Sequence, residues 1–133
     1  MATREEKNLS VTKHGTLPRV PFLAIKEKVL GKTYDLSISF VDEKTAQQLN
    51  ITHRQKDYIP NTLSFSLCTI PGKKSGEIVM CIAAIKKEYK KFEMSYDNYL
   101  VFLLSHSMLH LKGYEHGSTM EDKEQHYLAF FEL

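Results

Sequence analysis

Apolar and polar residues alternate along two stretches of the chain, residues 34–40 and residues 62–67. Strict alternation is typical of a strand with one buried face, so both stretches are predicted strands. Residues 77–81 form a short apolar run after a turn-rich segment and predict a third strand, and residues 9–12 are a candidate fourth. These stretches predict a small β-sheet.

Helical periodicity describes most of the remaining chain. A helix is predicted from residue 22 to Gly31, because Pro18 and Pro21 precede it and glycine readily ends a helix. Asp42 is a suitable N-cap for a second helix that ends at about residue 49. Further helices are predicted over residues 83–92, 95–112 and 118–131.

The order of these elements predicts the fold class. Strands come first and the long helices last, which favours an α+β fold with a small mixed sheet and helices packed against it. The 133 residues are enough for one hydrophobic core, so we expect a single domain over residues 1–133.

The composition excludes several classes of protein. With 42% hydrophobic and 26% charged residues, the chain is neither a disordered tail nor a collagen-like or coiled-coil rod. No apolar run approaches the roughly 20 residues that cross a bilayer, so no membrane partner is expected, and the polar first residues do not resemble a signal peptide. Two cysteines, Cys68 and Cys81, are too few for a secreted disulfide scaffold. We therefore expect a reduced, cytoplasmic protein with both cysteines buried.

Charge is unevenly distributed along the chain. Residues 1–91 hold 16 basic and 9 acidic side chains, whereas residues 92–133 hold 2 and 7. The basic residues are densest at four lysines that follow an earlier pair: Lys86, Lys87, Lys90 and Lys91, preceded by Lys73 and Lys74. Such a group is either a solvated helix face or a surface that attracts phosphates, and charge alone leaves both interpretations open.

Three histidines lie within eleven residues and suggest a metal site. His106 and His110 are four residues apart on a predicted helix, so their side chains project from the same face. Gly113 can end that helix, and His116 then returns as a third ligand. Three protein ligands leave one position open, as in catalytic zinc sites. We expect one zinc ion per chain at the end of this core helix, with nickel or copper as alternatives. The other interpretation, a merely polar helix edge, is disfavoured because the helix is otherwise apolar and a buried unpaired imidazole pair costs free energy.

The same histidine spacing occurs in metzincin proteases, which carry a glutamate general base after the first histidine. Here that position is Ser107, whose hydroxyl cannot take up a proton from zinc-bound water at neutral pH. A peptidase is therefore a minor alternative. A phosphodiester, which already carries negative charge, needs a cation more than a carboxylate, and Arg54 in the loop before the second strand is a candidate. The alternative for Arg54 is a surface ion pair with Asp57.

The motifs that carry this chemistry together resemble the YbeY family of bacterial endoribonucleases. They are Arg54-Gln-Lys56-Asp57, Asn61-Thr-Leu63-Ser64-Phe65, Gly76-Glu-Ile78-Val79, and the segment from His106 through His110 and Gly113-Tyr114-Glu115 to His116. The resemblance implies a zinc-dependent endoribonuclease that matures the 3′ end of small-subunit rRNA and takes part in ribosome quality control. It implies that His106, His110 and His116 bind zinc and that Arg54 is essential for cleavage.

The chain departs from the family pattern at three places. Ser107 replaces the usual glycine, Glu115 replaces aspartate before the last histidine, and Ile59-Pro60 replaces Pro-Thr. None of these changes removes a ligand, so they bear on substrate positioning more than on metal binding. The expected partners are RNA, rRNA and ribosomal particles, and the oligomeric state is not predicted. The second alternative to an RNase is a non-catalytic ribosome-assembly module in which zinc only stabilises the chain.

Overall fold

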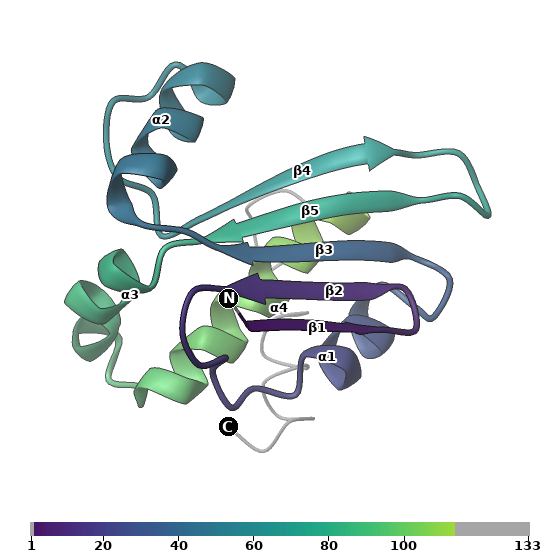
Figure 1. Ribbon diagram of the computed structural model, residues 1–133, viewed down its shortest axis with the longest axis horizontal. Helices are drawn as coiled ribbons and strands as arrows, with labels where there is room; N and C mark the ends of the chain where they lie inside the picture. Colours follow the sequence, from purple (N-terminus) through teal and green to yellow (C-terminus); the bar gives the residue numbers. More distant parts are fainter. Residues whose placement is uncertain (1, 114–133) are drawn as a thin grey trace.

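The computed structural model describes residues 2–113, whose five strands form one sheet in the order β1-β2-β3-β5-β4 (Figure 1). The strands are β1 (Ala2–Glu6), β2 (Leu9–Lys13), β3 (Asp35–Phe40), β4 (Thr62–Cys68) and β5 (Ser75–Met80). Strands β2, β3 and β5 are parallel to one another, whereas β1 and β4 are antiparallel edge strands. The predicted α+β class with a small mixed sheet is confirmed.

The described helices are α1 (Phe22–Val29), α2 (Glu43–Arg54), α3 (Ile82–Glu88), the short 3₁₀ helix η1 (Tyr89–Phe92) and α4 (Tyr96–Lys112). Helices α1 and α4 lie against one face of the sheet, and α2 and α3 gather at the end where β3 and β5 terminate (Figure 1). Among these helices, none combines the length and the apolar character needed to cross a membrane.

The hydrophobic core lies between the sheet and the helices α1 and α4. On β3, Leu36, Ile38 and Phe40 point inward and are buried, while the alternating residues are not. Helix α4 buries nine of its 17 residues. Each fully buried aliphatic side chain stabilises the fold by about 1.5–3 kcal/mol, so α4 is a rigid support for the histidines at its end.

Both ends of α4 agree with the sequence prediction. The Ser95 hydroxyl accepts a hydrogen bond from the Asn98 N–H at 3.2 Å, as an N-cap does. Gly113 adopts a left-handed conformation with φ of 109° and donates its N–H to the His110 carbonyl at 3.0 Å. Glycine takes this conformation without strain, which ends the helix directly after its histidine-bearing turn.

Two differences from the predicted elements concern the start of the chain and one helix. Strand β1 was not predicted: its residues are mostly polar, and it is defined by pairing with β2 through a two-residue turn at Lys7 and Asn8, both with positive φ. The helix predicted over residues 83–92 is α3 followed by η1. The helix predicted over residues 118–131 lies outside the described residues.

Helix α2 extends farther than predicted, to Arg54 instead of about residue 49. Asn50 is fully buried and donates its side-chain N–H to the Tyr58 carbonyl at 3.0 Å, so the polar residues that suggested a loop are accommodated within the helix. Gln55 then ends the helix in a left-handed conformation. Arg54 is therefore in the last helical turn, and its placement in a loop is wrong.

Candidate functional site

A cavity of about 640 Å³ lies where the edge strand β4, the second half of α4 and the end of α2 meet. Its lining combines one arginine, two histidines, an amide, four hydroxyl side chains and three leucines: Arg54, Asn61, Thr62, Leu63, Ser64, Ser66, Leu103, His106, Ser107, His110 and Leu111. Three of the four predicted site residues, Arg54, His106 and His110, therefore share one cavity although more than 50 positions separate the arginine from the histidines.

The two histidines face each other across one turn of α4. Their ring centroids are 4.7 Å apart with the planes at 84°, and their Nε2 atoms are 3.1 Å apart. Two nitrogens that bind one tetrahedral zinc at 2.0–2.1 Å are themselves about 3.3 Å apart. The Nε2 pair of His106 and His110 therefore fits a shared metal ion.

The third predicted ligand, His116, lies outside the described residues. Within residues 2–113 no group of three histidine, cysteine or acidic side chains comes close enough to hold a metal ion. The described part of the chain thus supplies two nitrogen ligands to the cavity, and the complete ligand set remains the one predicted from the sequence.

Arg54 reaches the cavity from the last turn of α2. Its Nη1 donates to the Asn50 side-chain oxygen at 3.4 Å, a long hydrogen bond that leaves the exposed guanidinium weakly tethered. The alternative ion pair with Asp57 is not formed, and Asp57 accepts a hydrogen bond from Gln47 at 3.1 Å. The guanidinium is therefore available to an anionic ligand in the cavity.

Ser107 occupies the position where a metzincin carries its glutamate. It is buried, and its hydroxyl shares a hydrogen bond with the Thr62 hydroxyl at 2.8 Å. This contact joins α4 to β4, so Ser107 has a role in packing two walls of the cavity together.

Asn61 is a cavity residue whose partners the sequence did not reveal. Its side-chain N–H donates to Glu88 at 2.6 Å, and the Tyr99 hydroxyl donates to the same carboxylate oxygen at 2.9 Å. Burial, together with the contact to Glu88, raises the pKa of the Tyr99 hydroxyl well above its usual range. Because a carboxylate only accepts, this network fixes the Asn61 amide in one orientation. Asn61 lies in one of the motifs that resemble the YbeY family. Glu88 lies 27 positions away, and nothing in the sequence indicated that it contacts Asn61.

The basic group on α3 and η1 is partly engaged. Lys87 forms an ion pair with Glu43 at 2.9 Å, and the Lys86 ammonium lies 5.6 Å from the centre of the Tyr96 ring.

The expectation of two buried cysteines is half right: both are free, Cys81 is buried, and Cys68 is partly exposed.

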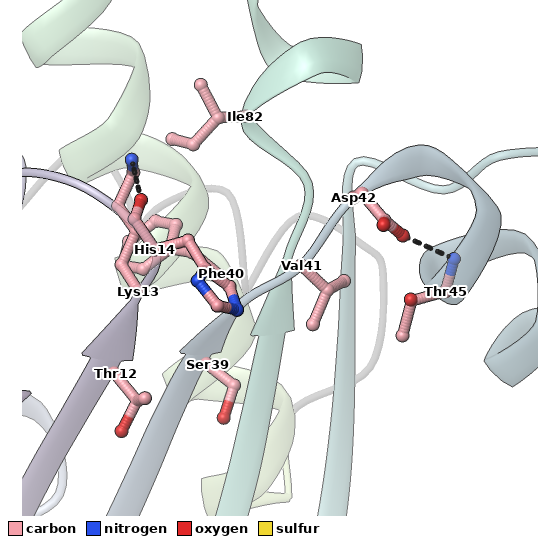
Figure 2. Close-up of a pocket in the computed structure, with 9 residues that line it drawn as sticks. All are labelled: Thr12, Lys13, His14, Ser39, Phe40, Val41, Asp42, Thr45 and Ile82. Atoms are coloured by element: carbon pink, nitrogen blue, oxygen red, sulfur yellow. Dashed lines mark hydrogen bonds between the residues drawn. The ribbon is translucent and has the colours of Figure 1, made fainter. Parts of the chain in front are cut away.

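A second cavity, of about 630 Å³, lies at the carboxyl ends of β2 and β3 and contains none of the predicted site residues. Figure 2 shows Asp42 there, accepting a hydrogen bond from the Thr45 N–H as the N-cap of α2, and Lys13 donating to the His14 carbonyl. Its lining mixes a carboxylate, an ammonium and an imidazole with apolar side chains, which favours no single class of ligand.

Comparisons with known proteins agree with the resemblance in the motifs. Residues 3–130 match the family model described as Endoribonuclease YbeY. A protein of that name from Ureaplasma urealyticum is 40% identical over 86 residues, covering 63% of this chain and 56% of the relative. One from Staphylococcus aureus is 31% identical over 112 residues, covering 76% and 72%.

The structural comparison concerns the fold alone. The solution structure of TM1509 from Thermotoga maritima matches with a TM-score of 0.57 and 24% sequence identity. The match covers 80% of this chain and 73% of the TM1509 chain. In length, the chain spans 56% of the Ureaplasma relative and 59% of another Endoribonuclease YbeY, from Alkaliphilus oremlandii, which is 38% identical over 89 residues.

Proposed function

Because the chain belongs to the YbeY family, we propose that it is a zinc-dependent endoribonuclease that hydrolyses single-stranded RNA. We place its activity in the cytoplasm, in maturation of the 3′ end of small-subunit rRNA and in ribosome quality control, with ribosomal particles as partners. The proposed unit is one domain over residues 1–133 with one zinc ion per chain. The observation that carries the proposal is the single cavity that brings Arg54 together with His106 and His110.

In the proposed site, His106, His110 and His116 hold the metal. A zinc ion held there would supply positive charge and would lower the pKa of water towards neutrality. Arg54 binds non-bridging phosphate oxygens through its planar guanidinium and stabilises the negative charge that grows on them as the P–O bond breaks. The long tether to Asn50 allows the guanidinium to adjust to the substrate.

The flanking lysines are proposed to attract the RNA backbone. Lys73 and Lys74 at the turn between β4 and β5, and Lys90 and Lys91 on η1, are all exposed. Exposed lysines draw a polyanion towards the cavity through a long-range, salt-dependent force. Lys86 and Lys87 contribute less, because each already contacts another side chain.

A peptidase is disfavoured by the cavity lining. Among the described residues that line it there is no carboxylate, and Ser107 is hydrogen-bonded to Thr62. A metzincin-type reaction needs a carboxylate base at that position.

The test is to measure zinc by elemental analysis and to incubate the same sample with rRNA fragments and with casein. The proposal predicts about one zinc per chain, cleavage of single-stranded rRNA and intact casein. Cleavage of casein would support the peptidase, and bound zinc with no cleavage of either substrate would support the assembly module.

A further inference from the structure

Strand β4 is both an edge of the sheet and a wall of the cavity. Within the described residues it pairs with β5 on one side only, and its other edge is open. Four residues of β4 line the cavity: Thr62, Leu63, Ser64 and Ser66. An open strand edge presents unpaired N–H and C=O groups that bind an extended ligand.

The hydrogen-bond pattern shows which residues of β4 present these groups. Cys81 donates its N–H to the Asn61 carbonyl at 2.9 Å, and Val41 donates to the Met80 carbonyl at 2.9 Å, so the backbone of Met80 points towards β3 and away from β4. Thr62, which faces Met80 in the register, is then a non-hydrogen-bonded position. Because the pattern alternates, the main-chain groups of Thr62, Ser64 and Ser66 point to the open edge.

The side chains of the same three residues lie on the cavity side. Thr62 contacts Ser107 of α4, which fixes that face, and alternation places Ser64 and Ser66 beside it. Phe65 points to the other face, where its ring packs against His53 with the centroids 5.0 Å apart. The open edge therefore combines outward main-chain donors and acceptors with a row of hydroxyls.

Charge along this edge favours an anionic ligand. No acidic residue occurs between Asp57 and Glu77, while Arg54 lies near the start of β4 and Lys73 and Lys74 follow its far end. The seven residues of β4 span about 23 Å, the length of several nucleotides. A phosphodiester chain supplies acceptors for the outward N–H groups, and its 2′-hydroxyls supply donors for the outward carbonyls.

We infer that single-stranded RNA lies along the open edge of β4, from the histidine pair to the lysines at the β4–β5 turn. This inference rests on the proposed function and adds the path of the substrate. The main-chain N–H groups of Thr62 and Ser64 donate to phosphate oxygens, and the outward carbonyls accept from ribose 2′-hydroxyls. The contact to 2′-hydroxyls makes the edge bind RNA more tightly than DNA of the same sequence.

The first test compares Ser64→Pro with Ser64→Ala. Proline removes the outward N–H without removing a ladder hydrogen bond, whereas alanine removes only the hydroxyl. We expect Ser64→Pro to weaken binding of a ten-nucleotide oligouridylate about tenfold or more, and Ser64→Ala to weaken it less. A Ser64→Pro protein that retains the wild-type circular dichroism spectrum and binds this RNA as tightly as the wild type overturns the inference.

The second test measures hydrogen exchange in the wild-type protein, so it does not depend on the folding of a variant. The amides of Thr62 and Ser64 should exchange more slowly when the oligouridylate is bound, and its DNA counterpart should protect them less. Unchanged exchange with saturating RNA, or protection by a casein-derived peptide instead, overturns the inference. RNA that protects these amides but is not cleaved contradicts the proposed nuclease activity while supporting the path.

The third test concerns the far end of the path. Lys73→Ala/Lys74→Ala should reduce the slope of log K against log salt for the oligouridylate by about 1.4, because each single-strand phosphate contact contributes about 0.7. A trinucleotide, which does not reach the turn, should bind the variant and the wild type equally. Lys28→Ala/Lys32→Ala removes the same charge elsewhere and should leave the slope unchanged. Equal slopes for the two double variants overturn the assigned path.

Discussion

Replacing Arg54 with alanine should separate the cost to catalysis from the cost to folding. The guanidinium is exposed and makes one long hydrogen bond, 3.4 Å to Asn50, while Asn50 keeps its own bond to the Tyr58 carbonyl. Loss of that bond leaves the side-chain oxygen of the buried Asn50 without this donor and, together with loss of a basic side chain at a helix C-terminus, costs about 1–2 kcal/mol of unfolding free energy. Loss of a group that stabilises transition-state charge costs about 2.7–4 kcal/mol of activation free energy, or 10²–10³-fold in rate.

The assay is single-turnover cleavage of single-stranded RNA, with RNA binding, zinc content and thermal unfolding measured on the same preparation. Arg54→Ala should keep its zinc, unfold within a few degrees of the wild type and bind RNA with a smaller loss than it shows in cleavage. Arg54→Lys should recover little, because an ammonium lacks the planar pair of donors. Lys56→Ala, a neighbouring exposed cation that does not line the cavity, is the matched control. Equal losses of binding and cleavage would make Arg54 a docking residue, and unchanged cleavage would refute its assigned role.

Three further predictions test other parts of the structure. Ser107→Ala should lower the unfolding free energy by about 1 kcal/mol through loss of the 2.8 Å hydrogen bond to Thr62, yet keep cleavage within about tenfold; a thousandfold loss would give the serine a chemical role. Gly76→Ala should destabilise by about 1–3 kcal/mol in urea unfolding, because the new methyl group meets the Tyr34 hydroxyl, and Tyr34→Phe should restore part of this loss; additive effects would contradict the contact. The raised pKa of Tyr99 means that ionisation favours the unfolded chain, so unfolding free energy should fall above about pH 10, and Tyr99→Phe should show a shallower fall between pH 9 and 11.

Local patterns predicted most of the fold, because most elements bury one regularly spaced set of side chains. The alternation at residues 62–67 identified β4, and the serine N-cap and Gly113 identified the ends of α4. Strand β1 could not be predicted in this way, since an edge strand with little buried surface depends on its pairing with β2.

Lys26 shows a second limit of pattern analysis. It lies on α1, is fully buried, and its ammonium donates to the carbonyls of Lys7 at 3.4 Å and Lys32 at 3.0 Å. Burial lowers the pKa of this amine from its usual value. Both acceptors are main-chain atoms of turns, so no residue type in the sequence indicated where this charge would find partners.

One part of the candidate site could be predicted from local sequence patterns, and the other part could not. The spacing of His106 and His110 predicted that they share a helix face, and their Nε2 atoms are 3.1 Å apart. The approach of Arg54 to these histidines depends on how α2 packs beyond the edge of β4. The need for a cation beside a phosphodiester made Arg54 a candidate, and the family resemblance supported it, but no local pattern indicated this packing. The roles of all four residues, including His116, stay predictions until the variants are measured.

The most direct test of a metal-dependent nuclease centre is the zinc content and single-turnover RNA cleavage of His110→Ala. Two remaining imidazoles are a poor site for a four-coordinate ion, so we expect most of the zinc to be lost and cleavage to fall on the order of 10²-fold or more. His14→Ala, an exposed histidine in the second cavity, should keep both zinc and activity. A His110→Ala protein with one zinc per chain, or one that cleaves RNA at the wild-type rate, would contradict the assignment of this cavity as the catalytic centre.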